Sequence, residues 1–246
     1  MNIQIFQNSG LLGNAAAEYS AGILKRRIAE KGEARIVLST GASQFDTFNA
    51  LINSDVEWDK VEMFHLDEYI NLPETHPASF RRYLKDRFVS KVPLKKANFV
   101  KGEGDIRENI RELTEELRKK PIDLGLIGIG ENAHIAFNDP PADFDTKEAF
   151  IIVDLDDACK RQQVGEGWFP TVDDVPKHAI TMTVFQIMRC SEIISCVPYK
   201  VKANAIKLTL ENDITNLIPA TILKRHDHFT LFLDKDSAAY IRVSTS

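Results

Sequence analysis

The stretch Asp123-Leu-Gly-Leu-Ile-Gly-Ile-Gly-Glu-Asn-Ala-His134-Ile-Ala-Phe-Asn-Asp139-Pro140 begins as a nearly unbroken apolar run. Such a run predicts a strand that is buried on both faces, as in a parallel sheet. Two glycines then interrupt the run, and four polar residues follow: Glu131, Asn132, His134 and Asp139. In open α/β sheets the ligand crevice lies outside the carboxyl ends of the strands. These residues are therefore candidates for chemistry, and a histidine close to a carboxylate can move protons near neutral pH.

The rest of the chain alternates strand and helix patterns, which is typical of a parallel sheet wrapped by helices. We find no linker or repeat that divides it, so we expect one domain over residues 1–246. Strands are predicted at 3–6, 35–39, 61–66, 122–129, 150–153, 192–197 and 229–233. Helices are predicted at 14–31, from Ser43 to about 52, and at 79–88, 105–119 and 200–210.

Composition narrows the class of protein. Hydrophobic residues make up 43% of the chain and charged residues 27%, an ordinary balance for a soluble globular protein. The net charge of -5 argues against nucleic acid as the main partner, but an anionic small molecule stays open. Cys159, Cys190 and Cys196 lack metal-site spacing and leave one cysteine over, which favours a reducing cytosol. The N-terminal segment does not read as a signal peptide, and no apolar run is long enough to span a bilayer. We therefore expect a cytoplasmic protein with no membrane partner.

Two further strand ends carry polar groups. The first is Thr40-Gly41-Ala42-Ser43, whose small residues let backbone N–H groups approach an anion ahead of a helix. The alternative interpretation is a simple turn in which Ser43 caps the helix. The second is His65-Leu-Asp67-Glu68-Tyr69, where an acid could act as a proton-shuttling base or lie in a solvated turn.

A metal site receives little support from the sequence. Asp67, Glu68, His65 and His134 are suitable ligand types, but no two of them have a helical i, i+4 spacing. We therefore expect no metal. His134 could also be a structural histidine satisfied by a neighbouring carboxylate. Lys202, at the start of a predicted helix, is either solvated or paired with an anion in the crevice.

Five segments together resemble the glucosamine-6-phosphate deaminase (isomerase) family, part of a superfamily that includes 6-phosphogluconolactonases. The resemblance covers most of the chain and implies a single doubly wound α/β domain with a mostly parallel sheet, helices on both faces and a lid. The segments that carry it are Ser39-Thr-Gly-Ala-Ser43, Phe64-His-Leu-Asp-Glu-Tyr69 with Leu72-Pro73, His76-Pro-Ala-Ser79-Phe80, Gly128-Ile-Gly130 through His134-Ile-Ala-Phe-Asn-Asp139-Pro140, and Lys202-Ala-Asn-Ala205.

The resemblance also implies an activity: conversion of glucosamine 6-phosphate to fructose 6-phosphate and ammonia, without a metal or organic cofactor. Asp67 matches the carboxylate that moves a proton between C2 and C1 of the sugar. His134 matches the histidine that assists ring opening. The phosphate loop matches Thr40, Gly41, Ala42 and Ser43, and Lys202 matches the lysine that reaches the phosphate. The implied partner is a small sugar phosphate, and homo-oligomerisation is left open.

The chain departs from the family at positions around the histidine. Asn132 stands where the family normally has Asp, and Asp139 where it has Glu, so one charge near His134 is missing. The family's phosphate-binding arginine has no clear equivalent, although Arg161 is nearby in sequence. A 6-phosphogluconolactonase-type hydrolase and a sugar-phosphate-binding protein with impaired catalysis are the alternatives. Tyr69 favours the deaminase branch, since the lactonases typically have Arg at that position.

Overall fold

The computed structural model describes residues 1–241, so the last five residues of the expected domain lie outside the described part. Its centre is a seven-stranded sheet of order β1–β10–β9–β6–β2–β3–β5, in which every neighbouring pair is parallel. Strands β2, β6, β9 and β10 are buried along their whole length, as expected for a sheet covered on both faces. The strands are β1 (Asn2–Phe6), β2 (Ala34–Leu38), β3 (Val61–His65), β5 (Lys96–Asn98), β6 (Leu124–Leu126), β9 (Glu192–Val197) and β10 (Phe229–Asp234).

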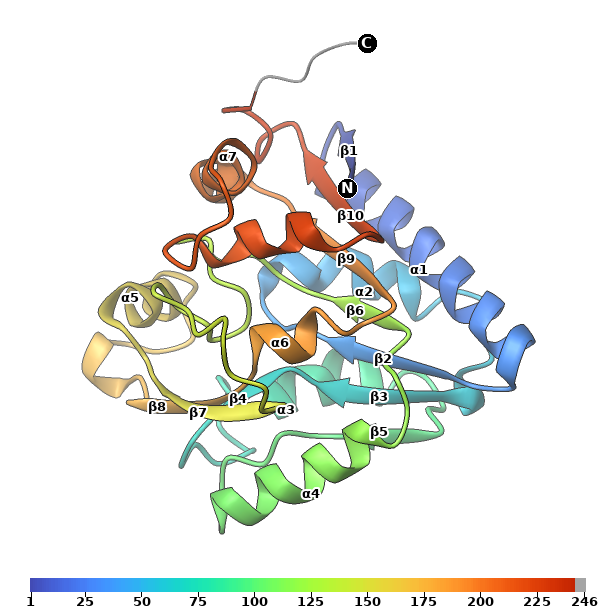
Figure 1. Cartoon of the computed structure of the whole chain (residues 1–246), viewed down its shortest axis with the longest axis horizontal. Helices are drawn as coiled ribbons and strands as arrows, with labels where there is room; N and C mark the ends of the chain where they lie inside the picture. The colour runs from blue at the N-terminus through green and yellow to red at the C-terminus, as the bar shows by residue number, and fades with distance from the viewer. Residues whose placement is uncertain (242–246) are drawn as a thin grey trace.

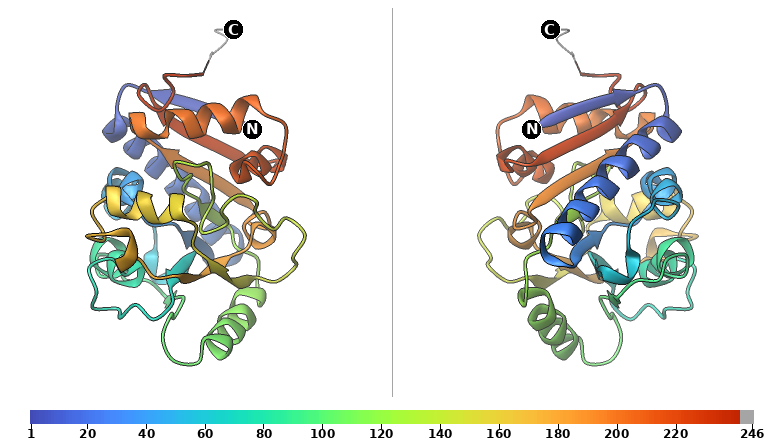
Figure 2. Two further views of the ribbon diagram at one scale, coloured as in Figure 1. Left: turned by 90° about the vertical axis from the view of Figure 1, so that its left-hand side faces the viewer. Right: turned by 90° about the vertical axis from the view of Figure 1, so that its right-hand side faces the viewer.

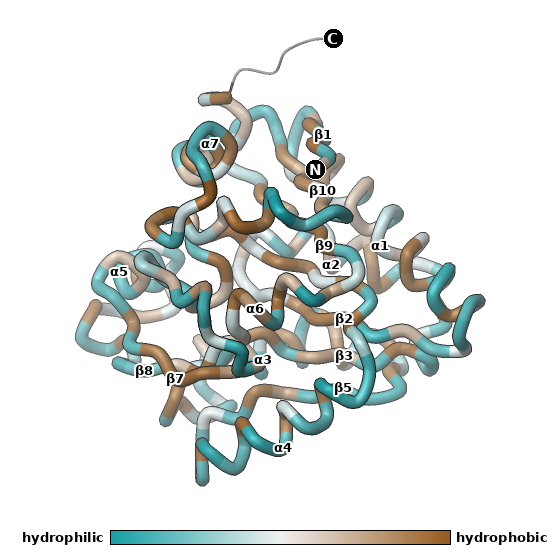
Figure 3. Tube along the Cα trace, viewed as in Figure 1, coloured by the Kyte–Doolittle hydropathy of each residue, from teal (hydrophilic) through white to brown (hydrophobic). Residues whose placement is uncertain are grey.

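Helices cover both faces of this sheet (Figure 1 and Figure 2). One apolar core lies between the sheet and α1 (Ser9–Lys31), α2 (Phe45–Leu51) and α3 (Phe80–Leu84). The other core packs the opposite face against α4 (Ile106–Arg118), α6 (Val184–Ile187) and α7 (Ala203–Glu211). Hydrophobic residues are concentrated on the central strands between these two layers (Figure 3). The predicted doubly wound α/β fold is therefore confirmed.

The strand order fixes where a ligand crevice belongs. From β2 the chain steps outward through β3 to β5. It then returns to β6, beside β2, and steps the other way through β9 to β10, which lies next to the first strand, β1. The order therefore reverses between the adjacent strands β2 and β6. Ligands bind outside the carboxyl ends of the strands at such a switch point. The polar segments that follow β2, β3 and β6 meet there.

A second, antiparallel sheet lies at this end of the molecule, and the sequence did not predict it. It has the order β4–β8–β7, with β4 (Asp67–Tyr69), β8 (His178–Met182) and β7 (Phe150–Asp154). The segment predicted at 150–153 is a strand, but it pairs antiparallel with β8. Since this partner comes from a different part of the chain, local sequence does not show that the strand lies outside the parallel sheet. Beside this sheet, an aromatic cluster around Tyr69 and Phe137 packs under α5 (Asp157–Gly165).

Several predicted boundaries were wrong for local reasons. Helix α1 begins at Ser9, because the Asn8 side chain accepts a hydrogen bond from the N–H of Leu11, and it ends at Gly32 as predicted. The strand predicted at 122–129 is regular only over β6, although backbone hydrogen bonds of Asp123 and Ile127 to the neighbouring strands continue it by one residue at each end. The helix predicted at 79–88 continues after α3 as a π-helix over Lys85–Val89, and the helix predicted at 200–210 starts as a 3-10 turn over Lys200–Lys202. Smaller 3-10 segments span Ala42–Gln44, Trp58–Lys60, Val172–Asp174 and Pro219–Arg225.

Candidate active site

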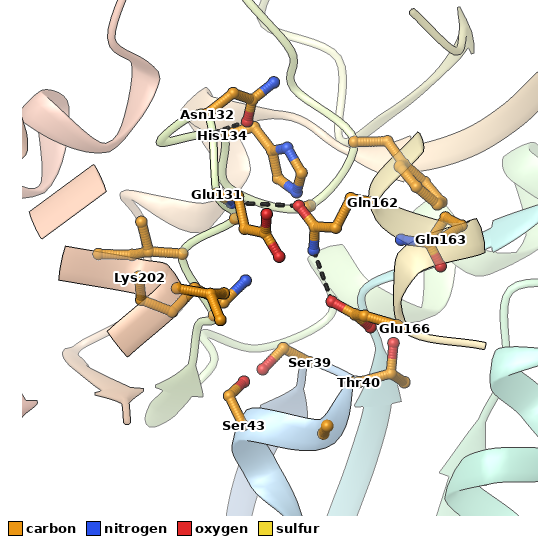
Figure 4. Close-up of a pocket in the computed structure, with 18 of the residues that line it drawn as sticks. Ser39, Thr40, Ser43, Glu131, Asn132, His134, Gln162, Gln163, Glu166 and Lys202 are labelled. Carbon is orange, nitrogen blue, oxygen red and sulfur yellow. Dashed lines mark hydrogen bonds between the residues drawn. The ribbon is translucent and has the colours of Figure 1, made fainter. Parts of the chain in front are cut away.

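A cavity of about 680 Å³ opens at the switch point (Figure 4). This is the size of an ordinary small-molecule site. Three segments at strand ends contribute to its wall: the Thr40–Ser43 segment after β2, Asp67 at the start of β4 just beyond β3, and the loop from Gly128 to His134 after β6. Helix α5 and Lys202 close the other sides. The structure therefore brings together nearly all the residues that the sequence singled out.

The His134 ring is held by the acid predicted to support it. Its Nδ1 lies 3.0 Å from Oδ1 of Asp139, and the side chain is almost fully buried. The amide Nδ2 of Asn132 donates to the same Asp139 oxygen at 3.2 Å, while its Oδ1 accepts the backbone N–H of His134 at 3.1 Å. Asn132 thus orders the loop without adding a charge. A Cβ on Gly130 would lie 2.3 Å from the imidazole, so the ring requires glycine there.

Asp139 is the charged partner of this group. Burial raises its pKa, but hydrogen bonds from His134, Asn132 and the Cys159 thiol outweigh burial and leave the pKa below the usual value of an aspartate. Asp139 is therefore ionised across the neutral range. An ionised carboxylate at this position fixes the orientation of the imidazole.

Asp67 reaches the cavity and Glu68 does not, as the alternation along a strand predicts. The Glu68 carboxylate is fully buried on the other side, where it accepts hydrogen bonds from Ser79 Oγ at 2.8 Å and Arg81 Nε at 3.1 Å. Burial, and then the neighbouring Glu68 charge, raises the pKa of Asp67 well above its usual value. A carboxyl group with a raised pKa is a better proton acceptor than an ordinary aspartate, which suits general base catalysis.

The Thr40–Ser43 segment and Lys202 form another part of the wall. Gly41 has a φ of 107°, a conformation that favours glycine, and it leads into the 3-10 turn over Ala42–Gln44. The alternative interpretation of Ser43 as a helix cap is wrong, because Ser43 lies inside the 3-10 turn and the N-cap position of α2 is Gln44. Lys202 is 7% exposed, and its burial lowers the pKa of the ammonium group. Because Lys202 is almost fully buried in the cavity wall, the alternative interpretation of Lys202 as a solvated surface lysine is wrong.

Several polar cavity residues received no role from the sequence, although Ser39 and Arg161 were noted there. Ser39 has a buried hydroxyl without a hydrogen-bond partner in the described structure. Tyr199 adopts a φ of 80°, and its N–H donates to the Asp234 carboxylate. The others come from α5 and its end: Arg161, which is exposed at the cavity wall, Gln162 and Glu166. Nothing in the sequence indicates the positive φ at Tyr199. The one sequence signal for α5 is Asp156, a residue type that commonly caps the start of a helix.

The residues weighed as metal ligands do not form one site. His65 is fully buried, and burial followed by the Arg81 charge lowers its pKa to about 3. Among the described residues, one group of three potential ligands lies within 4.8 Å: His134, Asp139 and Cys159. Burial, and then the Asp139 carboxylate, raises the pKa of the Cys159 thiol far above its usual value. Since metals bind the thiolate, the thiol here serves as a hydrogen-bond donor to Asp139.

The fold is a mostly parallel, doubly wound α/β sheet. Its cavity brings together a carboxylate, a histidine–aspartate pair and a buried lysine, which are groups suited to acid–base chemistry in an α/β enzyme. The sequence model of the glucosamine-6-phosphate isomerases/6-phosphogluconolactonase family matches residues 7–232, and the chain belongs to this family.

Named relatives support the membership over nearly the whole chain. A glucosamine-6-phosphate deaminase of Thermoanaerobacter sp. (strain X514) is 33% identical over 98% of this chain and 95% of its own length. One from Oenococcus oeni is 32% identical over 92% of this chain and 94% of its own. The solved structure of a monomeric glucosamine-6-phosphate deaminase superposes with a TM-score of 0.89 at 28% identity, covering 98% of this chain and all of that one.

The lactonase branch shares the fold at lower identity. A 6-phosphogluconolactonase from Trypanosoma brucei superposes with a TM-score of 0.78 at 16% identity, with 98% of each chain covered.

The part of the chain that the structure describes contains no helix with the length and hydropathy of a membrane span.

Proposed function

We propose that this chain is an amino-sugar phosphate isomerase and deaminase that converts glucosamine 6-phosphate and water to fructose 6-phosphate and ammonia. The observation that carries the proposal is one cavity lined by Asp67 and by His134, which is paired with Asp139. This chemistry needs two proton-transfer groups with different properties. The relatives with the highest identity reported above are named for the same reaction.

In this proposal His134 opens the sugar ring by passing a proton between the C1 hydroxyl and the ring oxygen. Asp139 holds the imidazole and balances its charge when it is protonated. Asn132 supplies a neutral hydrogen bond in place of a second acid. Ring opening gives the aldehyde on which the isomerisation acts.

Asp67 then removes the proton from C2 and returns it to C1. The electron pair of the C2–H bond moves through the enolamine, and reprotonation at C1 leaves an imine at C2. Water adds to that carbon and ammonia leaves, so atoms balance without an oxidant or a metal. A carboxyl group on a buried strand end, with a raised pKa, suits a base that must hold and return one proton.

The phosphate is assigned to Thr40, Gly41, Ala42 and Ser43 together with Lys202. Backbone N–H groups at the start of the 3-10 turn have no partner within the turn, and a buried ammonium group supplies the positive charge. No cofactor takes part in the proposed steps. We propose a site that is complete in a monomer, as in the similar solved deaminase structure, which is monomeric, and homo-oligomerisation stays a prediction.

The three buried free cysteines suit the predicted reducing cytoplasm, which is part of the proposal. The functional test is a paired assay of ammonia release from glucosamine 6-phosphate and acid release from 6-phosphogluconolactone. We expect ammonia and no acid. Acid release would support the lactonase alternative, and tight binding of hexose phosphates with neither product would support a sugar-phosphate-binding protein.

A further inference from the structure

Glu166 is an acid in the cavity that the proposed reaction does not use. It follows the last residue of α5 and shares the cavity with Lys202 and with Glu131 (Figure 4). The carboxylates of Glu166 and Glu131 both oppose the effect of burial on the pKa of Lys202. The one almost fully buried cation of the cavity is therefore accompanied by two acids.

Hydrogen bonds hold the Glu166 side chain in one orientation. Oε1 accepts from Gln162 Nε2 at 2.8 Å, and Oε2 accepts from the Trp168 indole N–H at 3.1 Å. The Gln162 amide is itself fixed, because its Oε1 accepts the backbone N–H of Glu131 at 3.1 Å. Glu166 is thus connected to the histidine loop through one amide, as the dashed lines in Figure 4 show.

The same carboxylate is connected to the phosphate loop through aromatic residues. The Trp168 ring packs edge-on against Tyr83, with ring centroids 6.4 Å apart. The Tyr83 hydroxyl donates to the carbonyl oxygen of Gly41 at 2.8 Å. These contacts therefore fix the position of the Glu166 carboxylate relative to the proposed phosphate site.

A carboxylate in this place conflicts with a bare phosphate. An ionised carboxylate accepts hydrogen bonds and donates none, and it has about four lone-pair positions. Two are used by Gln162 and Trp168. Inorganic phosphate at pH 7.5 is mainly a dianion, so it and the carboxylate repel each other by charge even though its one P–OH group can donate a hydrogen bond. A sugar hydroxyl both donates and accepts, and it can bond to Glu166 and to the Lys202 ammonium at once.

We propose that Glu166 is a specificity-determining residue that accepts a hydrogen bond from a hydroxyl of the substrate and weakens binding of phosphate that lacks an attached polyol. The pocket then selects hexose 6-phosphates over inorganic phosphate, although both carry the group that Lys202 recognises. This inference rests on the sugar-phosphate ligand of the proposed function, but not on its turnover.

The test compares two ligands by calorimetric titration at pH 7.5: inorganic phosphate, and glucitol 6-phosphate, an open-chain polyol that lacks an aldehyde. Glu166→Gln keeps an oxygen that accepts the hydroxyl but removes the charge. We expect it to tighten phosphate binding by about tenfold or more, with a smaller change for glucitol 6-phosphate. Glu112→Gln, on the exposed surface of α4, controls for the loss of one negative charge and should change neither affinity.

Glu166→Leu removes both the charge and the acceptor. In that variant the affinity ratio of glucitol 6-phosphate to phosphate should fall by about tenfold or more, because the hydroxyl loses its partner. An unchanged phosphate affinity in Glu166→Gln, or a retained ratio in Glu166→Leu, overturns the inference. Neither titration measures ammonia release, so both binding results can be interpreted even if the chain shows no deaminase activity.

Discussion

Replacing Asn132 by Asp restores the charge that the histidine loop lacks, and the structure predicts a strong pH dependence for this change. Asn132 Nδ2 lies 3.2 Å from Asp139 Oδ1. In Asn132→Asp an acidic oxygen takes the place of that donor. Two charges at this separation repel by about 5 kcal/mol at an effective dielectric constant of about 20. That energy corresponds to between three and four pKa units, as an upper limit.

The two carboxyl groups of the variant should therefore share one proton at neutral pH and titrate as a pair. The pKa of the pair is raised in the folded protein, so the bound proton stabilises the variant at low pH. This stability is lost as the pH rises from the unfolded carboxyl value of about 4 through the raised folded value. Relative to the unchanged chain, Asn132→Asp should lose several kcal/mol between pH 5 and pH 9.

Urea denaturation of both proteins at a series of pH values measures this difference. Asn49→Asp on the exposed surface of α2 is the matched control, and its difference from the unchanged chain should vary little with pH. A stability difference for Asn132→Asp that is equal at pH 5 and pH 9 would refute the reasoning, since the donor would then not face Asp139.

Three further variants or profiles test other parts of the site. Gly130→Ala, whose Cβ would lie 2.3 Å from the imidazole, should lower kcat by about a hundredfold, while Gly22→Ala on α1, with open space around it, should retain activity. Lys202→Met should weaken glucitol 6-phosphate binding by about tenfold or more in a titration, and the exposed Lys200→Met should change it little. Because burial raises the pKa of Asp67, protonation of this base should make kcat/KM decline with a midpoint above pH 4 as the pH is lowered. A decline with its midpoint at or below pH 4 would contradict the role of Asp67 as the base.

The positions of the main candidates followed from local rules that the sequence carries. Carboxyl ends of parallel strands meet at one edge, so the sequence alone predicts that Thr40, Asp67 and His134 lie together. Alternation along a strand likewise explains why Asp67 and not Glu68 lines the cavity. These features depend on residues close in sequence and on a repeating backbone geometry.

The remaining features depend on contacts between distant segments. Glu166 reaches the cavity only because α5 packs over the small antiparallel sheet, whose pairing of β4 with β8 joins segments more than 100 residues apart. The role of Asn132 as a donor to Asp139 depends on how one amide is turned, which composition cannot show. The buried environment of Lys202 likewise needs the walls of the whole cavity.

The central claim is that Asp67 carries a proton between C2 and C1 of an amino-sugar phosphate. Turnover of glucosamine 6-phosphate in deuterium oxide, followed by NMR of the fructose 6-phosphate formed, tests it most directly. The unchanged chain should place deuterium at C1, and Asp67→Asn should incorporate none while still binding glucitol 6-phosphate. Deuterium at C1 in the product of Asp67→Asn, at a rate close to that of the unchanged chain, would contradict the account.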